Sequence, residues 1–165
     1  MSTTFIALDP GGTTGWARYR PSDAEGKQFL VGQIGPNEHH NKLYEFLELQ
    51  ESSHYVIICE SFEFRQRVED AARTNIELTS KEYIGVVKLY GQQHPLTSVV
   101  FQTAGAAKGF IPDKPRNGLE ANAKLKIMGL YVPAHKHAMD AMRHLIYHLV
   151  NTQGMTHLIR PWKDL

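Results

Sequence analysis

The sequence predicts an α/β fold, in which helices flank a five-stranded mixed sheet of three antiparallel strands followed by two parallel ones. Two observations predict it. The first third of the 165-residue chain holds short apolar runs separated by tight turns, which is typical of an antiparallel meander. Beyond it, apolar runs alternate with segments of helical periodicity, which implies parallel crossovers. The length suits one domain of ordinary size, so we expect a single domain over residues 1–165.

The first three strands are expected at residues 5–9, 14–19 and 29–32. The segments Pro-Gly-Gly-Thr at 10–13 and Pro-Ser-Asp-Ala-Glu-Gly at 21–26 are rich in turn-forming residues. Both are short enough to join neighbouring antiparallel strands. A helix should follow, because Leu43, Phe46 and Leu47 recur at helical spacing.

The second half of the chain alternates between strands and helices. Residues 55–59 are continuously apolar and rich in β-branched side chains, which predicts a strand buried on both faces. A fifth strand is expected at 98–102, with a helix at 78–92 before it. Residues 61–76 are polar and irregular, and residues 105–118, with two prolines and several glycines, should be largely loop. The last two helices are expected at residues 119–128 and 137–150.

Charge and cysteine content limit the function classes. The net charge is only +1, which predicts no polyanion partner by itself, but residues 1–100 carry −4 and residues 101–165 carry +5. A locally basic surface is compatible with phosphate contacts, and equally with an ordinary solvated face. No apolar run approaches the roughly 20 residues of a membrane helix. The N-terminus does not resemble a signal peptide, and Cys59 is the only cysteine, so we expect a cytoplasmic protein without membrane contact.

Two acidic residues, Asp9 and Glu60, each end a predicted buried strand. In an open α/β sheet, ligands bind at the carboxyl ends of the strands. Two carboxylates on neighbouring strand ends repel each other unless a cation lies between them, and Mg²⁺ prefers such oxygen ligands. The alternative is that each acid simply begins a solvated turn.

The last predicted helix carries a stripe of ionisable side chains. At 100° per residue, His137, Asp140, His144 and His148 fall within roughly 80° of one another. The opposite arc is apolar, so the helix is expected to be amphipathic. These side chains could be metal ligands or solvated residues. A zinc site that also uses His135 is conceivable, although no cysteine pair supports it.

These motifs together resemble the RuvC-type Holliday junction resolvases of the ribonuclease-H-like nuclease superfamily. Asp9-Pro10-Gly11 before a Thr-Gly-Trp strand resembles the opening motif of that family, and Cys59-Glu60 resembles its second acid. His137-x-x-Asp140-Ala141 resembles its C-terminal motif. The run from Gln102 to Gly109 and the segment 137–144 look closest to small resolvases of bacteriophages. The motifs follow in order from residue 5 to about residue 150.

The resemblance implies a ribonuclease-H-like fold and a crossover junction endodeoxyribonuclease. Such an enzyme is a homodimer that resolves four-way junctions and other branched DNA by paired nicks, leaving 5′-phosphate and 3′-hydroxyl ends. It uses Mg²⁺, for which Mn²⁺ can substitute, with two ions per site, and acts in recombination and repair. A viral protein would work in the cytoplasm of its bacterial host. The implied metal ligands are Asp9, Glu60, His137 and Asp140.

The resemblance also implies a set of DNA contacts. Lys108 looks like the basic residue of the family near the site, and it completes the catalytic set. Apart from the resemblance, Lys124 and Lys126 are candidates for positioning the DNA backbone. Phe62 and Phe64 could stack on unpaired bases or belong to the core. The family places an aromatic wedge three residues after the second acid, whereas this chain has Glu63 there. Junction stacking and cleavage preference are therefore expected to differ.

Three alternatives stay open at the level of sequence. One is a related nuclease that acts on flaps, forks or single strands. Another is a non-catalytic junction-binding module, against which the intact acid set argues. The third follows from residues 9–14, which also resemble the phosphate loop of actin-like and sugar-kinase ATPases. Those proteins need a second domain and an adenosine motif, and no Walker A sequence is present, so no nucleotide cofactor is expected.

Overall fold

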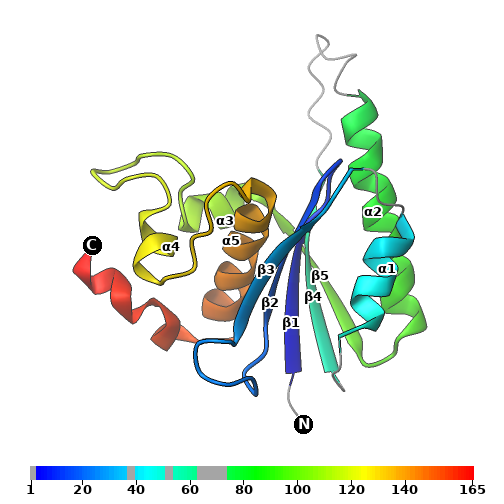
Figure 1. The fold of residues 1–165 in the computed structure, drawn as a ribbon, viewed down its shortest axis with the longest axis horizontal. Coiled ribbons are helices and arrows are strands. Elements are labelled where there is room, and N and C mark those ends of the chain that lie inside the picture. The colour runs from blue at the N-terminus through cyan, green and yellow to red at the C-terminus, as the bar shows by residue number, and fades with distance from the viewer. Residues whose placement is uncertain (1–2, 37–39, 51–53, 63–73) are drawn as a thin grey trace.

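The computed structural model describes residues 3–36, 40–50, 54–62 and 74–165 (Figure 1). Its elements are β1 (Thr3–Asp9), β2 (Thr14–Tyr19), β3 (Phe29–Ile34), α1 (His40–Glu48), β4 (His54–Ser61), α2 (Thr74–Gln93), β5 (Thr97–Thr103), α3 (Ala104–Phe110), α4 (Ala123–Ile127), α5 (Lys136–Asn151) and the 3₁₀ helix η1 (Thr156–Asp164). No helix in the described part of the chain is long and apolar enough to cross a membrane.

The strands form one sheet in the order β3-β2-β1-β4-β5. β1 and β3 each pair antiparallel with β2, whereas β4 runs parallel to both β1 and β5. The predicted mixed sheet, with three antiparallel strands and then two parallel ones, is confirmed. Its register places Leu8 opposite Cys59, so the next residues along both strands, Asp9 and Glu60, lie at the same edge.

Helices cover both faces of this sheet (Figure 1). Side chains alternate along β1, because successive residues of a strand point to opposite faces. Phe5 and Ala7 pack against α5, while Ile6 and Leu8 belong to the core beneath α1 and α2. Ile6 and Leu8 are fully buried, and each contributes about 1.5–3 kcal/mol of hydrophobic free energy. These two cores hold the end of β1 rigidly.

The prediction of a loop over residues 105–118 is wrong in its first part, where α3 begins directly after β5. Thr103 caps this helix, because its hydroxyl accepts a hydrogen bond from the Ala106 amide at 3.3 Å. Side chains at Gly105 and Gly109 would meet open space, so both face away from the packed side, while Ala107 is buried. A hydroxyl cap and an apolar contact thus outweigh the low helix propensity of two glycines.

Two further boundaries differ from the predictions, and one element was not predicted. The helix expected at 119–128 covers only Ala123–Ile127, because Asn122 before it has a left-handed backbone with φ of 60°. The irregular segment expected at 61–76 overlaps α2, which already begins at Thr74. The 3₁₀ helix η1 was not predicted. Residues 63–73, including the candidate Phe64, lie outside the described residues.

Candidate carboxylate site

Three acids meet near the carboxyl ends of β1 and β4. Asp9 and Glu60 come from these neighbouring parallel strands. α5 packs across β1 and β2, and its first turns bring His137 and Asp140 to the same place. The negative charges of Glu60 and Asp140 both act on Asp9. The sequence motifs at residues 9, 60 and 137–140 are therefore joined in space.

Asp9 and His137 form the most exposed pair of this site. His137 Nδ1 lies 2.9 Å from Asp9 Oδ2, and the exposed fractions of the side chains are 42% and 13%, respectively. Burial, together with the charges of Glu60 and Asp140, raises the pKa of Asp9 above its ordinary value against the opposing effect of His137. The hydrogen bond that His137 donates to Asp9 raises the pKa of His137. Burial and the neighbouring carboxylates therefore disfavour the charged form of Asp9 more than the hydrogen bond to His137 favours it.

Asp140 is buried and held by two cations. Arg143 Nη1 lies 2.5 Å from Oδ1, and Lys108 Nζ lies 3.4 Å from Oδ2. Arg143 is itself 2% exposed, donates to the Ile111 carbonyl oxygen at 3.1 Å and also donates to Asn122 Oδ1. This arginine ties α5 to the segment after α3 and fixes Asp140 in place.

Glu60 has a buried histidine as its partner. His144 Nε2 lies 2.8 Å from Glu60 Oε2, and its Nδ1 lies 3.0 Å from Gln102 Oε1. His144 is 1% exposed, so the imidazole is fixed by packing as well as by hydrogen bonds. Gln102 lies opposite Glu60 in the register of β4 and β5. The chain Gln102–His144–Glu60 therefore orients the carboxylate from behind.

Sequence reasoning missed Arg143, His144 and Gln102 as partners of the acids. A signal was present for the first, because Arg143 lies three residues after Asp140 and such helical pairs are neighbours. The predicted stripe of ionisable side chains is present on α5, but most of it is buried and does not form a solvated face. Asp140, His144 and His148 are all buried.

The far end of this stripe does not reach the site. His148 packs against Phe5, with 6.1 Å between ring centroids, and burial lowers its pKa. In the part of the chain that the structure describes, no group of three or more His, Cys, Asp or Glu side chains is arranged to hold a metal ion. This holds for the four histidines of the zinc alternative and equally for Asp9, Glu60, His137 and Asp140.

The donor set of the site nevertheless suits a hard divalent cation. Asp9, Glu60 and Asp140 supply carboxylate oxygens, the ligands that Mg²⁺ prefers. Burial and the charges of Glu60 and Asp140 disfavour a negative charge on Asp9, as its raised pKa reflects, and a cation beside Asp9 would offset that effect. Lys108 and Arg143 provide part of that charge at Asp140.

The remaining candidate residues lie at different distances from the acids. Lys108 is the nearest, at Asp140. Phe62 is half-buried two residues beyond Glu60, with Lys81 Nζ 5.4 Å from its ring centroid. The site does not bring the other two lysines to the acids. Lys124 Nζ donates to the Phe110 carbonyl oxygen at 2.7 Å and lies over the Trp162 ring, while Lys126 pairs with the exposed Glu120 at 3.0 Å.

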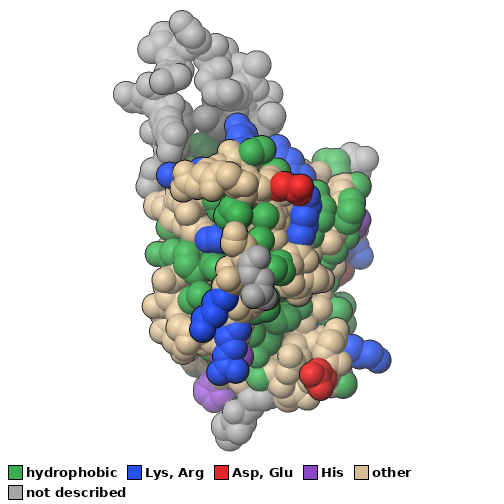
Figure 2. Space-filling model, turned by 90° about the vertical axis from the view of Figure 1, so that its left-hand side faces the viewer, with side chains coloured by type: hydrophobic (Ala, Val, Ile, Leu, Met, Phe, Trp, Pro, Cys, Tyr) green, Lys and Arg blue, Asp and Glu red, His purple; other side chains and the backbone are tan. Residues whose placement is uncertain are grey.

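The face formed by the C-terminal part of the chain carries more Lys and Arg than Asp and Glu (Figure 2). Residues 101–165 hold nine basic and four acidic residues, and this stretch includes α3, α4 and η1. This part of the chain is therefore more basic than the chain as a whole, whose net charge is +1.

The fold is that of RuvC. No protein-family model and no curated protein matches the chain. A solved structure of Thermus thermophilus RuvC in complex with Holliday junction substrate superposes with a TM-score of 0.60 at 14% identity, over 93% of this chain and 97% of that one. A second T. thermophilus RuvC structure gives 0.57 at 17% identity, over 92% and 96%. This likeness confirms the predicted ribonuclease-H-like fold.

Proposed function

We propose that this protein is a metal-dependent, structure-specific DNA endonuclease that resolves Holliday junctions and related branched DNA. The observation that carries the proposal is the meeting of Asp9, Glu60 and Asp140 at one sheet edge, in a fold shared with RuvC. The RuvC of the first comparison was solved with a Holliday junction substrate. The proposal includes the features that the sequence resemblance implies, namely paired nicks that leave 5′-phosphate and 3′-hydroxyl ends.

The metal ligands in this proposal are Asp9, Glu60, Asp140 and His137, holding two Mg²⁺ or Mn²⁺ ions. Bound ions supply a more acidic water and charge stabilisation at the phosphate. The protein holds the ligands in place: His144 fixes Glu60, and Arg143 fixes Asp140. Such supporting contacts orient metal ligands and tune their affinity.

Lys108 is the proposed phosphate contact. Burial lowers the pKa of its amino group, but the charges of Asp140 and Glu60 outweigh this effect, so its pKa is raised and it stays protonated. Its side chain is 36% exposed and can turn from Asp140 toward a DNA phosphate. A cation there would position the scissile strand and stabilise negative charge on it.

Cleavage of a panel of labelled DNA structures tests the proposal. With Mg²⁺, the protein should nick four-way junctions at symmetric positions and leave ends that ligase seals, while duplex stays intact. Two coordinated nicks need two sites, so the same preparation should sediment as a homodimer. If the protein is a monomer and cuts flaps, forks or single strands in preference to junctions, the proposal is wrong and the protein is a related nuclease. Binding without any cutting would leave a junction-binding module.

Metal removal should abolish cleavage. In EDTA no product is expected, and Mg²⁺ or Mn²⁺ should restore activity, because the acids alone repel the phosphodiester. Ca²⁺ should support junction binding without cutting, since its looser coordination geometry does not enforce in-line attack. Single-turnover rates in each ion measure the effect. Full activity in EDTA would exclude the metal site, and activity with Zn²⁺ alone would point to the histidines.

A further inference from the structure

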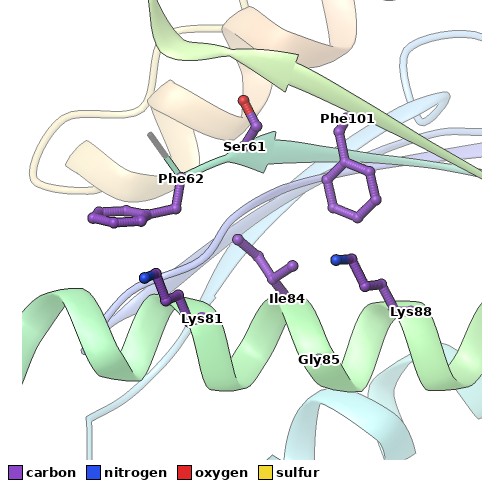
Figure 3. Close-up of a pocket in the computed structure, with 7 residues that line it drawn as sticks. All are labelled: Ser61, Phe62, Lys81, Ile84, Gly85, Lys88 and Phe101. Carbon is purple, nitrogen blue, oxygen red and sulfur yellow. The ribbon is translucent and has the colours of Figure 1, made fainter. Parts of the chain in front are cut away.

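A pocket of about 430 Å³ lies between α2 and the ends of β4 and β5 (Figure 3). It begins one residue beyond Glu60, because Ser61 and Phe62 line it. Phe101 of β5 forms the wall farther along the sheet, and Ile84 and Gly85 of α2 lie opposite. Successive residues of a strand point to opposite faces, so the pocket lies on the α2 face of the sheet, whereas Glu60 meets His144 of α5 on the other face. The pocket and the carboxylate site share the carboxyl end of β4.

The chemistry of this pocket combines aromatic faces with lysines. Lys81 Nζ lies 5.4 Å from the centroid of Phe62, and Lys88 Nζ lies 5.5 Å from that of Phe101. Both lysines project from α2 toward the two rings (Figure 3). Phe101 is 40% exposed, and among the residues that the structure describes no acidic side chain lines the pocket. Aromatic rings beside lysines are the usual means of holding a single DNA strand, through base stacking and phosphate contacts.

We propose that this pocket receives an unpaired base of a DNA strand that passes the carboxyl end of β4. The base stacks on Phe101, and the flanking phosphates lie against Lys81 and Lys88. The volume lies within the roughly 300–1,000 Å³ of sites for small molecules, which accommodates a flat base. The proposal rests on the proposed function, and it adds to that function a contact for an unpaired base of the branched substrate.

A second copy of the chain fits this surface less well than DNA. A two-fold contact centred on the pocket would place Lys81 and Lys88 against the same lysines of the other copy, and like charges repel. Phosphates are instead complementary to both lysines. Charge therefore favours the nucleotide.

Gly85 offers a variant that fills the pocket without disturbing the fold. A Cβ at Gly85 would meet nothing within 4 Å, and the residue lies within α2, where replacing glycine favours the helix. Gly85→Leu should block the pocket, whereas Gly85→Ala gives a similar helical benefit and leaves most of the space. Phe101→Ala removes the stacking face, and Lys88→Gln removes one phosphate partner.

The experiment measures affinity by fluorescence anisotropy in Ca²⁺, for a single-stranded oligonucleotide and for a junction with unpaired thymines at its crossover. We expect Gly85→Leu and Phe101→Ala to weaken both about tenfold, Gly85→Ala to match wild type, and Lys88→Gln to flatten the salt dependence by about one unit of slope. Thermal melting checks that each variant is folded.

The outcomes separate the two proposals. If wild type resolves junctions but folded Gly85→Leu and Phe101→Ala bind both probes like wild type, the pocket proposal is overturned and the function stands. If wild type never cuts junctions yet the variants still lose single-strand affinity, the proposed function fails and the pocket stands. If Gly85→Leu converts a dimer into a monomer, the pocket is a subunit contact and the proposal is overturned.

Discussion

Replacing Asp140 with Asn should reduce junction cleavage about 10³-fold or more while junction affinity changes little. The variant keeps the shape of the side chain but removes the negative charge that a divalent ion needs. Positioning and charge stabilisation supply most of the rate in metal-assisted phosphoryl transfer, so losing one ligand affects the reaction far more than binding. Single-turnover cleavage and gel shift on the same preparation measure both quantities.

The structure explains why binding should survive. Asp140 now holds Lys108 at 3.4 Å, and without the carboxylate charge this lysine is free to meet a phosphate. Affinity in EDTA should therefore equal or exceed that of wild type. Lys108→Ala should do the opposite, weakening binding and flattening its salt dependence. Glu120→Gln is the matched control, because it removes an acid that is 79% exposed and pairs only with Lys126 among its described contacts.

Stability needs its own measurement, because Asp140 is buried. Arg143 keeps the Ile111 carbonyl and Asn122 as partners, and the new amide oxygen can still accept from it. We therefore expect Asp140→Asn to stay folded in thermal melting. Cleavage at a near wild-type rate would make Asp140 a structural residue that only anchors Arg143. Joint loss of binding and cutting in a folded protein would mean that the acid shapes the DNA surface.

The sheet was predictable from sequence because its patterns are local. The apolar run at 55–59 and the turns at 10–13 and 21–26 depend on neighbouring residues alone. The helix at 104–110 was not predictable in the same way, because glycines at 105 and 109 are read as loop formers until the packing of Ala107 is known. In this helix the packing of Ala107 outweighs the low helix propensity of the two glycines.

The residues of the site also differ in whether local sequence patterns could predict them. Asp9 and Glu60 could be placed together because both end strands, and parallel neighbours end at one edge. The partners behind them depend on which elements cover α5. Its polar stripe is expected to face solvent, yet Arg143 and His144 are buried against residues far away in sequence, Ile111 and Gln102. Only the assembled fold supplies those partners.

Gly15 explains how α5 comes close enough to Asp9, and Gly15→Ala should disrupt the site. Gly15 is buried in β2 directly opposite Asp9 in the register of β1 and β2. A Cβ there would overlap the backbone carbonyl of His137 and the amide nitrogen of Ala138. Backbone atoms cannot turn away as a side chain can, so the start of α5 must move.

The displacement should affect both stability and catalysis. Overpacking of this kind costs about 1–3 kcal/mol in the free energy of unfolding. Misplacement of catalytic groups by about 1 Å can cost about 10²-fold in rate, so junction cleavage by Gly15→Ala should fall by at least that factor. Chemical denaturation and single-turnover cleavage measure the two effects. Gly12→Ala is the control, because a Cβ at Gly12 meets nothing within 4 Å.

A third measurement separates local displacement from general loss of stability. The hydrogen bond that His137 donates to Asp9 raises the pKa of His137 in the wild-type protein. When α5 moves away this bond weakens, so NMR titration should show a lower His137 pKa in Gly15→Ala than in wild type or in Gly12→Ala. An unchanged His137 pKa with wild-type cleavage would mean that α5 does not approach β2 this closely. In that case a larger residue at position 15 would be tolerated, and the geometry of the Asp9–His137 pair would need another cause.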